Sequence, residues 1–200
     1  DIQADIAREL IANGITVWIN NHRSVDEILN MMVQLGSLVG KSEQAITLVN
    51  QIQNNMDNIY EASQLIPKKP KVYFEEWYDP LISGSRWVSE LIELAGGVDV
   101  FKEDQVASLA KGRIIADHQE VVNRNPDIII ASWCGKKFKK EKLVARKNWH
   151  TISAVSNNHI YEMKSDIILQ PGPAAVTEGF AQMAGIIHAW KESSSFSNHP

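Results

Sequence analysis

Residues 71–101 read KVYFEEWYDPLISGSRWVSELIELAGGVDVF, and they indicate the class of fold. Val72–Phe74 are apolar and aromatic residues typical of a buried strand. Residues 75–85 predict an irregular loop, and the apolar spacing that follows predicts a helix over Arg86–Ala95. The Gly96-Gly97 pair supplies the glycine with which helices commonly end. A strand, a loop and a helix in this order make one unit of an α/β layer.

The same alternation continues toward the C-terminus. A short helix is expected at His118–Asn123, and Ile128–Ala131 is a continuous apolar run typical of a parallel strand covered on both faces. His159–Met163 predicts a further strand. Pro173 suits the first position of the last helix, and the Ser-rich residues 193–200 predict a disordered tail. We therefore expect a mostly parallel sheet.

Toward the N-terminus, helices alternate with one further strand. Residues 5–13 predict a helix, and the β-branched run Ile15–Ile19 predicts a buried strand. Ser24 is placed to cap the next helix, with Glu27 at the capping-box position. Residues 42–65 have apolar side chains at helical spacing and no Gly or Pro, which predicts one amphipathic helix about 35 Å long. Such a helix is either an ordinary packing helix or a rigid strut between two lobes.

Composition and charge exclude several classes of protein. The 200 residues have a formal net charge of −4 and a pI near 5.9, so we expect no nucleic-acid partner. No run approaches about 18 consecutive apolar residues, so no membrane span is expected, and no signal peptide is visible. Basic residues gather in residues 136–147. We interpret them as a solvated face, with an anion or partner site as the alternative.

The common catalytic and metal-binding motifs do not occur in the sequence. It lacks the GxGxxG and phosphate-loop patterns and the GxSxG elbow, and its histidines lack metal-ligand spacing. Cys134 has no evident histidine partner. Glu75 and Glu76 would point to opposite faces of a strand, which disfavours an acid/base pair. We therefore predict no catalytic residue, no metal site and no enzyme activity.

Aromatic residues follow the predicted strands. Trp77 and Tyr78 come after the first strand of residues 71–101, and Trp87 opens the helix that follows. Trp133 follows the strand at Ile128–Ala131. Ligands of open parallel sheets bind beyond the carboxyl ends of the strands, where rings give large apolar contacts. Any one of these rings could simply pack a surface, but Trp77 and Trp133 together predict a ligand wall.

Four blocks of the sequence resemble the periplasmic cobalamin- and siderophore-binding proteins of ABC importers. They are residues 71–101, Glu120–Ile130, Trp149–Glu162, and Ser165–Pro173 with the terminal helix. Their order and spacing, rather than any single block, carry the resemblance. The long helix before them is also characteristic of that family.

The resemblance implies two Rossmann-like lobes joined by one long, stiff helix, with the ligand between them. The expected fold class is α/β, with a Rossmann-like C-terminal lobe, a mostly parallel sheet, an inter-lobe helix and a remnant of an N-terminal α/β lobe. The expected parts are the end of the N-terminal lobe at 1–40, the connecting helix at 41–66, the C-terminal lobe at 67–192 and the disordered tail at 193–200.

The implied function is that of the solute-binding component of an ABC importer, which hands a metal chelate to the permease. Gln170 stands where many siderophore binders have an arginine, so cobalamin is expected before ferric siderophore or haem. The expected location is periplasmic or extracellular, with membrane anchoring through a preceding segment as an option. A chelatase-like tetrapyrrole enzyme and a protein-binding lobe are the alternatives. The expected ligand-binding residues are Glu76, Trp77, Tyr78, Asp79, Trp87, Trp133, Gly135, Lys136 and Gln170.

The resemblance also implies a residue that docks to the importer and a longer natural chain. Family members can engage the importer through an acid near the short helix before the strand at Ile128. Gln119 occupies the usual position, so we assign docking to Glu120 beside it. Family members also have further βα units before the position of residue 1. We therefore expect a chain truncated at its N-terminus, whose exposed strand edge would allow self-association.

Overall fold

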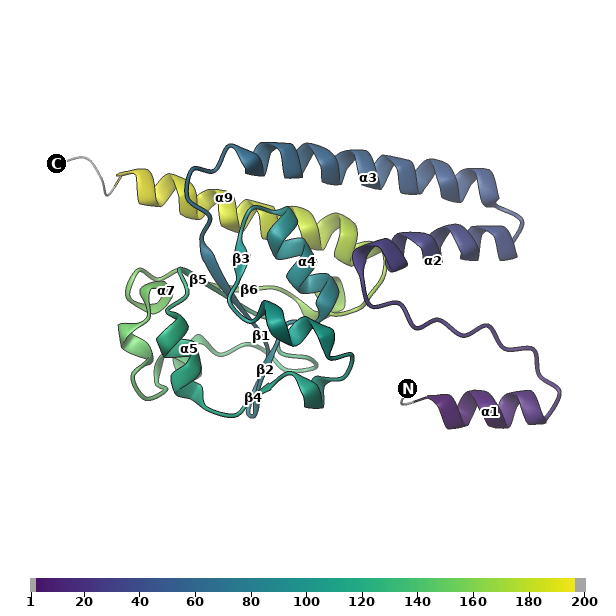
Figure 1. Cartoon of the computed structure of the whole chain (residues 1–200), viewed down its shortest axis with the longest axis horizontal. Coiled ribbons are helices and arrows are strands. Elements are labelled where there is room, and N and C mark those ends of the chain that lie inside the picture. Colours follow the sequence, from purple (N-terminus) through teal and green to yellow (C-terminus); the bar gives the residue numbers. More distant parts are fainter. Residues whose placement is uncertain (1–2, 197–200) are drawn as a thin grey trace.

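The structure is a computed structural model that describes residues 3–196. One mixed sheet lies at its centre in the order β4-β2-β1-β5-β6, with β3 paired to β1 (Figure 1). β1 runs parallel to β3 and β5, and β5 runs parallel to β6, whereas β2 is antiparallel to β1 and β4. The expected mostly parallel α/β sheet is confirmed. The strands are β1 (Lys71–Tyr78), β2 (Leu81–Ser83), β3 (Val98–Asp99), β4 (Ile114–Ile115), β5 (Ile128–Ala131) and β6 (Ile160–Glu162).

The irregular loop predicted at residues 75–85 is wrong over most of its length. β1 continues to Tyr78, turns at the cis Asp79-Pro80 bond, and returns as β2. In this hairpin Tyr78 pairs with Leu81, and a bulge interrupts the register after Glu75. Leu81 is fully buried, so the returning strand is held by the core as well as by its ladder.

The helices form where apolar spacing and capping residues predict them. Ser24 accepts from the backbone of Glu27, and Glu27 accepts from the backbone of Ser24, which confirms the capping box of α2. The last helix runs through Phe196, although the tail is predicted from residue 193 onward, and residues 197–200 lie outside the described residues. The helices are α1 (Ala4–Ala12), α2 (Val25–Leu38), α3 (Ser42–Gln64), α4 (Arg86–Leu94), α5 (His118–Arg124), α6 (Lys140–Val144), α7 (Ser153–Ser156), α8 (Ser165–Ile168) and α9 (Phe180–Phe196), with short helical turns η1 (Lys102–Val106), η2 (Ala110–Gly112), η3 (Trp149–Thr151) and η4 (Ala175–Gly179).

The sheet separates two apolar clusters. Val72 and Phe74 of β1 point into the larger cluster, which α2, α3, α4 and α9 complete. Tyr73, between them, points into the smaller cluster, where it meets Phe101 and Trp149. Figure 1 shows α3, α4 and α9 on one side of the sheet and α5 and α7 on the other. The alternation of Val72, Tyr73 and Phe74 between the two clusters is the two-residue period of a strand that is buried on both faces.

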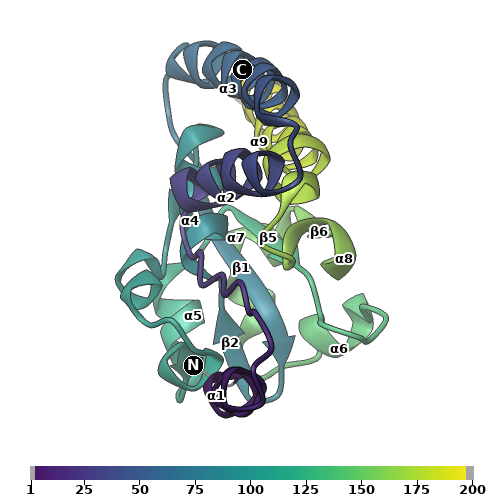
Figure 2. The ribbon, with the colours of Figure 1, turned by 90° about the vertical axis from the view of Figure 1, so that its right-hand side faces the viewer.

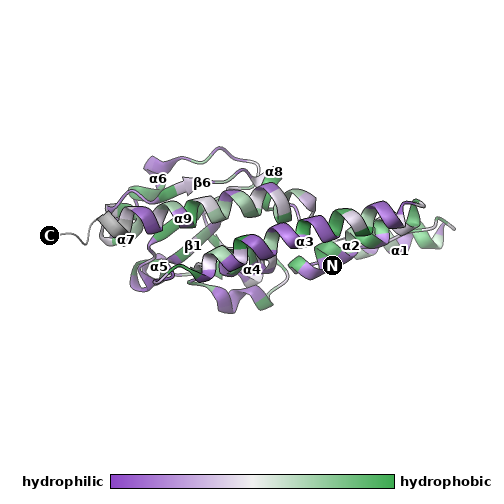
Figure 3. Cartoon of the chain, turned by 90° about the horizontal axis from the view of Figure 1, so that it is seen from above, coloured by the Kyte–Doolittle hydropathy of each residue, from purple (hydrophilic) through white to green (hydrophobic). Residues whose placement is uncertain are grey.

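The predicted long helix is confirmed as α3, and α2 folds back along it as a helical hairpin. Gly36 of α2 and Ala45 of α3 lie so close that a Cβ added at Gly36 would be 2.2 Å from the Cβ of Ala45. α3 also contacts α9, η4 and α4, and Figure 2 shows α3 lying over α9. Hydrophilic and hydrophobic positions alternate along α3 and α9 when they are seen from above, as in amphipathic packing helices (Figure 3).

The N-terminal segment differs from its prediction. The helix α1 is present, but it has no buried residue. The run Ile15–Ile19 is not a strand, and Ile15 and Ile19 are 51% and 61% exposed. A strand needs a neighbouring backbone with which to pair, and within residues 3–196 this run has none. Figure 1 shows it as an extended connection to α1, which lies apart from the sheet.

Candidate functional site

A buried ion pair lies near the end of the central strand. Glu75 of β1 is fully buried, and Arg146, after α6, donates to its two carboxylate oxygens at 2.5 and 3.0 Å. The indole N–H of Trp133 donates to the same carboxylate at 2.9 Å, and Arg146 also donates to the carbonyl of Tyr78 at 3.0 Å. These bonds replace the hydration that burial removes from both charges. They fix the loop after β5 and the segment after α6 to the end of β1.

Four aromatic rings pack in a row beside this ion pair. The ring of Tyr78 lies 4.8 Å from that of Trp133, and Trp77 lies 5.7 Å from Tyr78. Phe138 meets the far side of Trp133 edge-on at 5.0 Å. Trp133 is buried, whereas Trp77 and Tyr78 are half-buried at the outer end of the row. The structure thus joins Trp77 to Trp133 through Tyr78, at the carboxyl ends of two adjacent parallel strands.

Two lysines lie over the outer rings. The Nζ of Lys136 is 4.8 Å from the ring centroid of Trp77 and 5.2 Å from that of Tyr78. The Nζ of Lys142 is also 5.2 Å from the Tyr78 centroid. Gly135 makes the turn that brings Lys136 back over these rings, at a φ of 69° that favours glycine. The outer end of the row is therefore both aromatic and cationic.

Glu76 has a separate partner on the other side of the hairpin. The guanidinium of Arg113, itself buried, binds the Glu76 carboxylate at 2.7 Å and also donates to the carbonyl of Ser83. The Ser83 hydroxyl donates to Asp104 at 2.7 Å. Glu75 and Glu76 thus bind different arginines and do not form an acid/base pair with each other, as their adjacent positions in the strand predict.

Two of the predicted ligand-binding residues lie outside this cluster. Trp87 is buried in the larger apolar cluster, where its indole N–H donates to the carbonyl of Ile168 at 2.9 Å. Gln170 is exposed after α8. Asp79 is exposed at the hairpin turn, and its carbonyl accepts the indole N–H of Trp77 at 2.9 Å. The predicted set therefore divides into one cluster and separate positions around it.

The residue assigned to docking lies on a different surface. Glu120 is exposed on α5, where it forms an ion pair with Arg124 at 3.1 Å. Arg124 also pairs with Glu103 of η1 at 2.5 Å. These residues lie at or beside a shallow cavity of about 270 Å³ that Asp104 and Asp117 also line. Its neighbour Gln119 donates to Asn123 at 3.1 Å.

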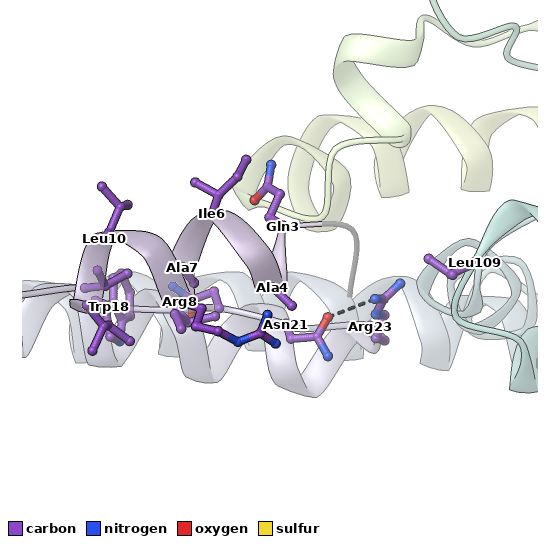
Figure 4. A pocket seen from close by; sticks show the side chains of 14 residues that line it. Gln3, Ala4, Ile6, Ala7, Arg8, Leu10, Trp18, Asn21, Arg23 and Leu109 are labelled. Atoms are coloured by element: carbon purple, nitrogen blue, oxygen red, sulfur yellow. Dashed lines mark hydrogen bonds between the residues drawn. The ribbon is translucent and has the colours of Figure 1, made fainter. Parts of the chain in front are cut away.

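An open cavity of about 870 Å³ lies at the N-terminal segment. It is lined by α1, by residues 17–21, by Arg23 and by Leu109, and Figure 4 shows Arg8, Asn21 and Arg23 along one side of it. Arg23 donates to the side-chain oxygen of Asn21 at 2.8 Å. None of the residues predicted to bind ligand lines this cavity. A smaller groove of about 390 Å³ is lined by residues of α3, η4 and α9.

Residues 3–196 contain no group of three or more His, Cys, Asp or Glu side chains that could hold a metal ion. Over the same residues, each helix is too short or too polar to cross a bilayer.

The sequence matches a known family over most of its length. A family model described as periplasmic binding protein matches residues 1–167. The chain belongs to the periplasmic binding protein family. A comparison of this periplasmic binding protein with curated proteins finds no match.

Solved structures show the same fold at low sequence identity. A possible iron-binding, periplasmic solute-binding protein of Staphylococcus epidermidis is 22% identical, with a TM-score of 0.75 over 92% of this chain and 70% of that one. IsdE of S. aureus, solved with haem, is 19% identical, with a TM-score of 0.75 over 94% and 74%. The vitamin B12-binding protein BtuF of Vibrio cholerae is 16% identical, with a TM-score of 0.71 over 94% and 70%. The α/β fold of the periplasmic binding protein is therefore shared with proteins that bind different ligands.

Sequence reasoning missed the residues that organise the cluster. Arg146 and Lys142 belong to the basic run at residues 136–147, but nothing in the run distinguishes them from lysines that only face solvent. Glu75 and Arg146 are far apart in the sequence, and so are Glu76 and Arg113. The sequence could have predicted that cationic partners exist, although not which residues they are. Two adjacent acids in an apolar strand each need a cationic partner when the strand is buried.

Proposed function

We propose that this protein is the solute-binding component of an ABC importer and that it binds a metal chelate at the aromatic end of its sheet. Membership of the periplasmic binding protein family supports the class. The row formed by Trp77, Tyr78 and Trp133 supports the position of the ligand site. Its outer rings are half-buried at the carboxyl ends of β1 and β5, where ligands of open parallel sheets bind. In this role the protein delivers its ligand to a membrane permease from the periplasmic or extracellular side.

The ligand candidates are cobalamin, a ferric siderophore and haem. All three are bulky chelates that need large apolar contacts, which indole and phenol rings supply. Sequence reasoning places cobalamin first because Gln170 replaces an arginine. Solved structures of the same fold include proteins described as iron-binding, B12-binding and in complex with haem. Lys136 and Gly135 belong to the same proposed site, and Glu120 is the proposed docking residue for the permease.

Titration of the 200-residue chain with cyanocobalamin, ferric citrate and haemin, followed by tryptophan fluorescence and calorimetry, tests the proposal. We expect at least one of them to bind. Trp77→Leu should weaken that binding at least about tenfold, because a few buried aromatic side chains often supply most of the binding free energy.

Trp18→Leu is the matched control, since Trp18 is also partly exposed but lines the 870 Å³ cavity beside α1. It should leave the affinity within about twofold of the wild type, a difference of less than about half a kcal/mol. Binding that is lost in Trp18→Leu and kept in Trp77→Leu would move the site to that cavity. Failure of all three chelates to bind would contradict the proposed function.

The alternative of a tetrapyrrole-modifying enzyme needs a histidine over the aromatic row. The ring of His118 lies against Trp149, and that of His159 approaches the hydroxyl of Tyr161. His150 is exposed on the turn η3. The contacts of these histidines therefore lie away from Trp77 and Trp133, and the described geometry favours the solute-binding function.

A further inference from the structure

Two lysine side chains place their ammonium groups over the same ring, that of Tyr78. Each Nζ lies 5.2 Å from the same ring centroid. The two nitrogens are therefore within about 10 Å of each other, which is comparable to the screening length of physiological salt. An anion bound over the Tyr78 ring would therefore be attracted by both ammonium groups.

The protein does not neutralise this pair. Among residues 3–196, neither Lys136 nor Lys142 has a carboxylate within ion-pair distance. The acids of the neighbouring strand are already committed, since Glu75 binds Arg146 and Glu76 binds Arg113. The ammonium groups lie on aromatic faces instead, and such contacts hold a cation in place without removing its charge.

The surrounding loop reinforces the positive field. Residues 136–147 contain seven lysines and arginines and one acid, Glu141, in a chain whose net charge is −4. A local excess of one sign attracts ligands of the other and raises their association rate. Of this run, Lys136 and Lys142 are the two residues whose ammonium groups lie over the outer rings of the aromatic row.

We propose that Lys136 and Lys142 form an anion clamp that binds the carboxylate groups of the ligand, while Trp77 and Tyr78 contact its body. This inference rests on the proposed function and narrows it to one class, the carboxylate-bearing metal chelates. It reverses the order of candidates that Gln170 suggested, because cobalamin carries amides and a phosphodiester but no carboxylate group. Ferric carboxylate siderophores and haem, with its two propionates, both carry the required groups.

The experiment compares two double variants of the 200-residue chain that remove the same charge from the same loop. Lys136→Gln/Lys142→Gln removes the clamp. Lys137→Gln/Lys139→Gln removes two exposed lysines that have no ring contact. Each protein is titrated by calorimetry and fluorescence with haemin, ferric citrate and cyanocobalamin at about 50 mM and about 500 mM sodium chloride, which changes screening severalfold.

We expect haemin or ferric citrate to bind the wild type. The clamp variant should bind it roughly five- to thirtyfold more weakly, as loss of two partly exposed ion pairs predicts, and the control variant should change the affinity less than about twofold. High salt should weaken binding to the wild type and reduce the difference between the variants.

The other outcomes separate the two proposals. Binding of cyanocobalamin alone would overturn the clamp and leave the solute-binding function standing. Equal loss in both double variants would also overturn the clamp, because the attraction would then be that of the whole basic run. Absence of binding by all three probes would overturn the clamp and the proposed function together.

Discussion

Glu75 illustrates what a buried charge requires of its neighbours. Its carboxylate accepts bonds from Arg146 and from the indole of Trp133, so a residue of β1 determines where two distant loops lie. Removal of one partner of such a pair leaves an uncompensated charge in the interior, which costs far more than loss of an exposed ion pair. The ion pair is thus important for the aromatic row as well as for stability.

Arg146→Ala should lower the free energy of unfolding by about 3–5 kcal/mol. Urea denaturation followed by circular dichroism measures the change. The control is Arg8→Ala, because Arg8 pairs with Asp5 where the two side chains are 75% and 88% exposed. It should cost no more than about 1 kcal/mol. Similar effects of the two substitutions would contradict the assignment of Glu75–Arg146 as a buried pair.

Asp99 should make the protein less stable as the pH rises. Burial raises the pKa of its carboxyl above the ordinary 3.8, although the backbone N–H of Phe101, at 3.0 Å, opposes this. The folded protein therefore holds the proton more tightly than the unfolded chain, and stability is lost as the pH rises from 3.8 through the raised pKa. Asp99→Asn should gain stability relative to the wild type between about pH 3 and pH 7 in urea titrations. A difference that does not change with pH would contradict this.

Among single residues, the sequence predicted the aromatic residues of the row better than the arginines that bind the acids beside them. Trp77 and Trp133 follow strands, and the structure brings them into one row. Trp87 also follows a strand along the chain, but the buried stripe of α4 carries its ring into the core. A position after a strand places the backbone of a residue near the edge of the sheet. The face of the helix on which the residue lies determines whether its side chain points into the core. Arg113 and Arg146 could not be predicted, because their partners lie far away in the sequence.

The contact between α2 and α3 depends on one missing side chain. A Cβ at Gly36 would lie 2.2 Å from the Cβ of Ala45 and 3.2 Å from the carbonyl oxygen of Lys41. Alanine usually stabilises a helix relative to glycine, but here the two helices would have to separate. Gly36→Ala should therefore lower the free energy of unfolding by about 1–3 kcal/mol in urea titrations.

Gly185 provides the opposite case within α9, because a Cβ there meets no atom within 4 Å. Gly185→Ala should raise the free energy of unfolding by about 0.5–1 kcal/mol. The double variant Gly36→Ala/Ala45→Gly should recover part of what Gly36→Ala loses. Stabilisation by Gly36→Ala alone would show that the hairpin is looser than the structure places it.

Among the elements, long helices with apolar periodicity were predictable from the sequence. The pairing partner of a strand was not predictable from the composition of that strand alone. The apolar spacing of residues 42–65 is realised as α3, and Ser24 begins α2 where the capping pattern places it. Ile15–Ile19 has equally good strand composition, but no strand of residues 3–196 pairs with it. A strand is a property of two segments, so the composition of one segment is insufficient. The hairpin at Asp79-Pro80 was missed because its returning strand spans only Leu81–Ser83.

The whole molecule combines a well-packed α/β body with a weakly attached N-terminus. β5 is buried along its entire length, whereas α1 contributes no buried residue. A helix of nine residues with no buried side chain is marginal in water. Stability should therefore be distributed unevenly along the chain.

Native-state hydrogen exchange should show that difference directly. Amides of α1 should exchange almost as fast as those of an unfolded peptide, and amides of β5 should exchange only on global unfolding. Mass spectrometry or NMR of the 200-residue chain at neutral pH measures both. Strong protection of α1 would mean that it packs against another surface in solution.

The segment between α1 and α2 should be the part of the chain that proteases cleave first. Such enzymes bind their substrates as extended backbone, and residues 15–23 already have that form without a neighbouring strand to hold them. Trp18 lies in this segment and is exposed, which makes the bond after it a preferred cut for a chymotrypsin-like protease. A single cleavage there would release α1 and leave the body that carries the aromatic row intact.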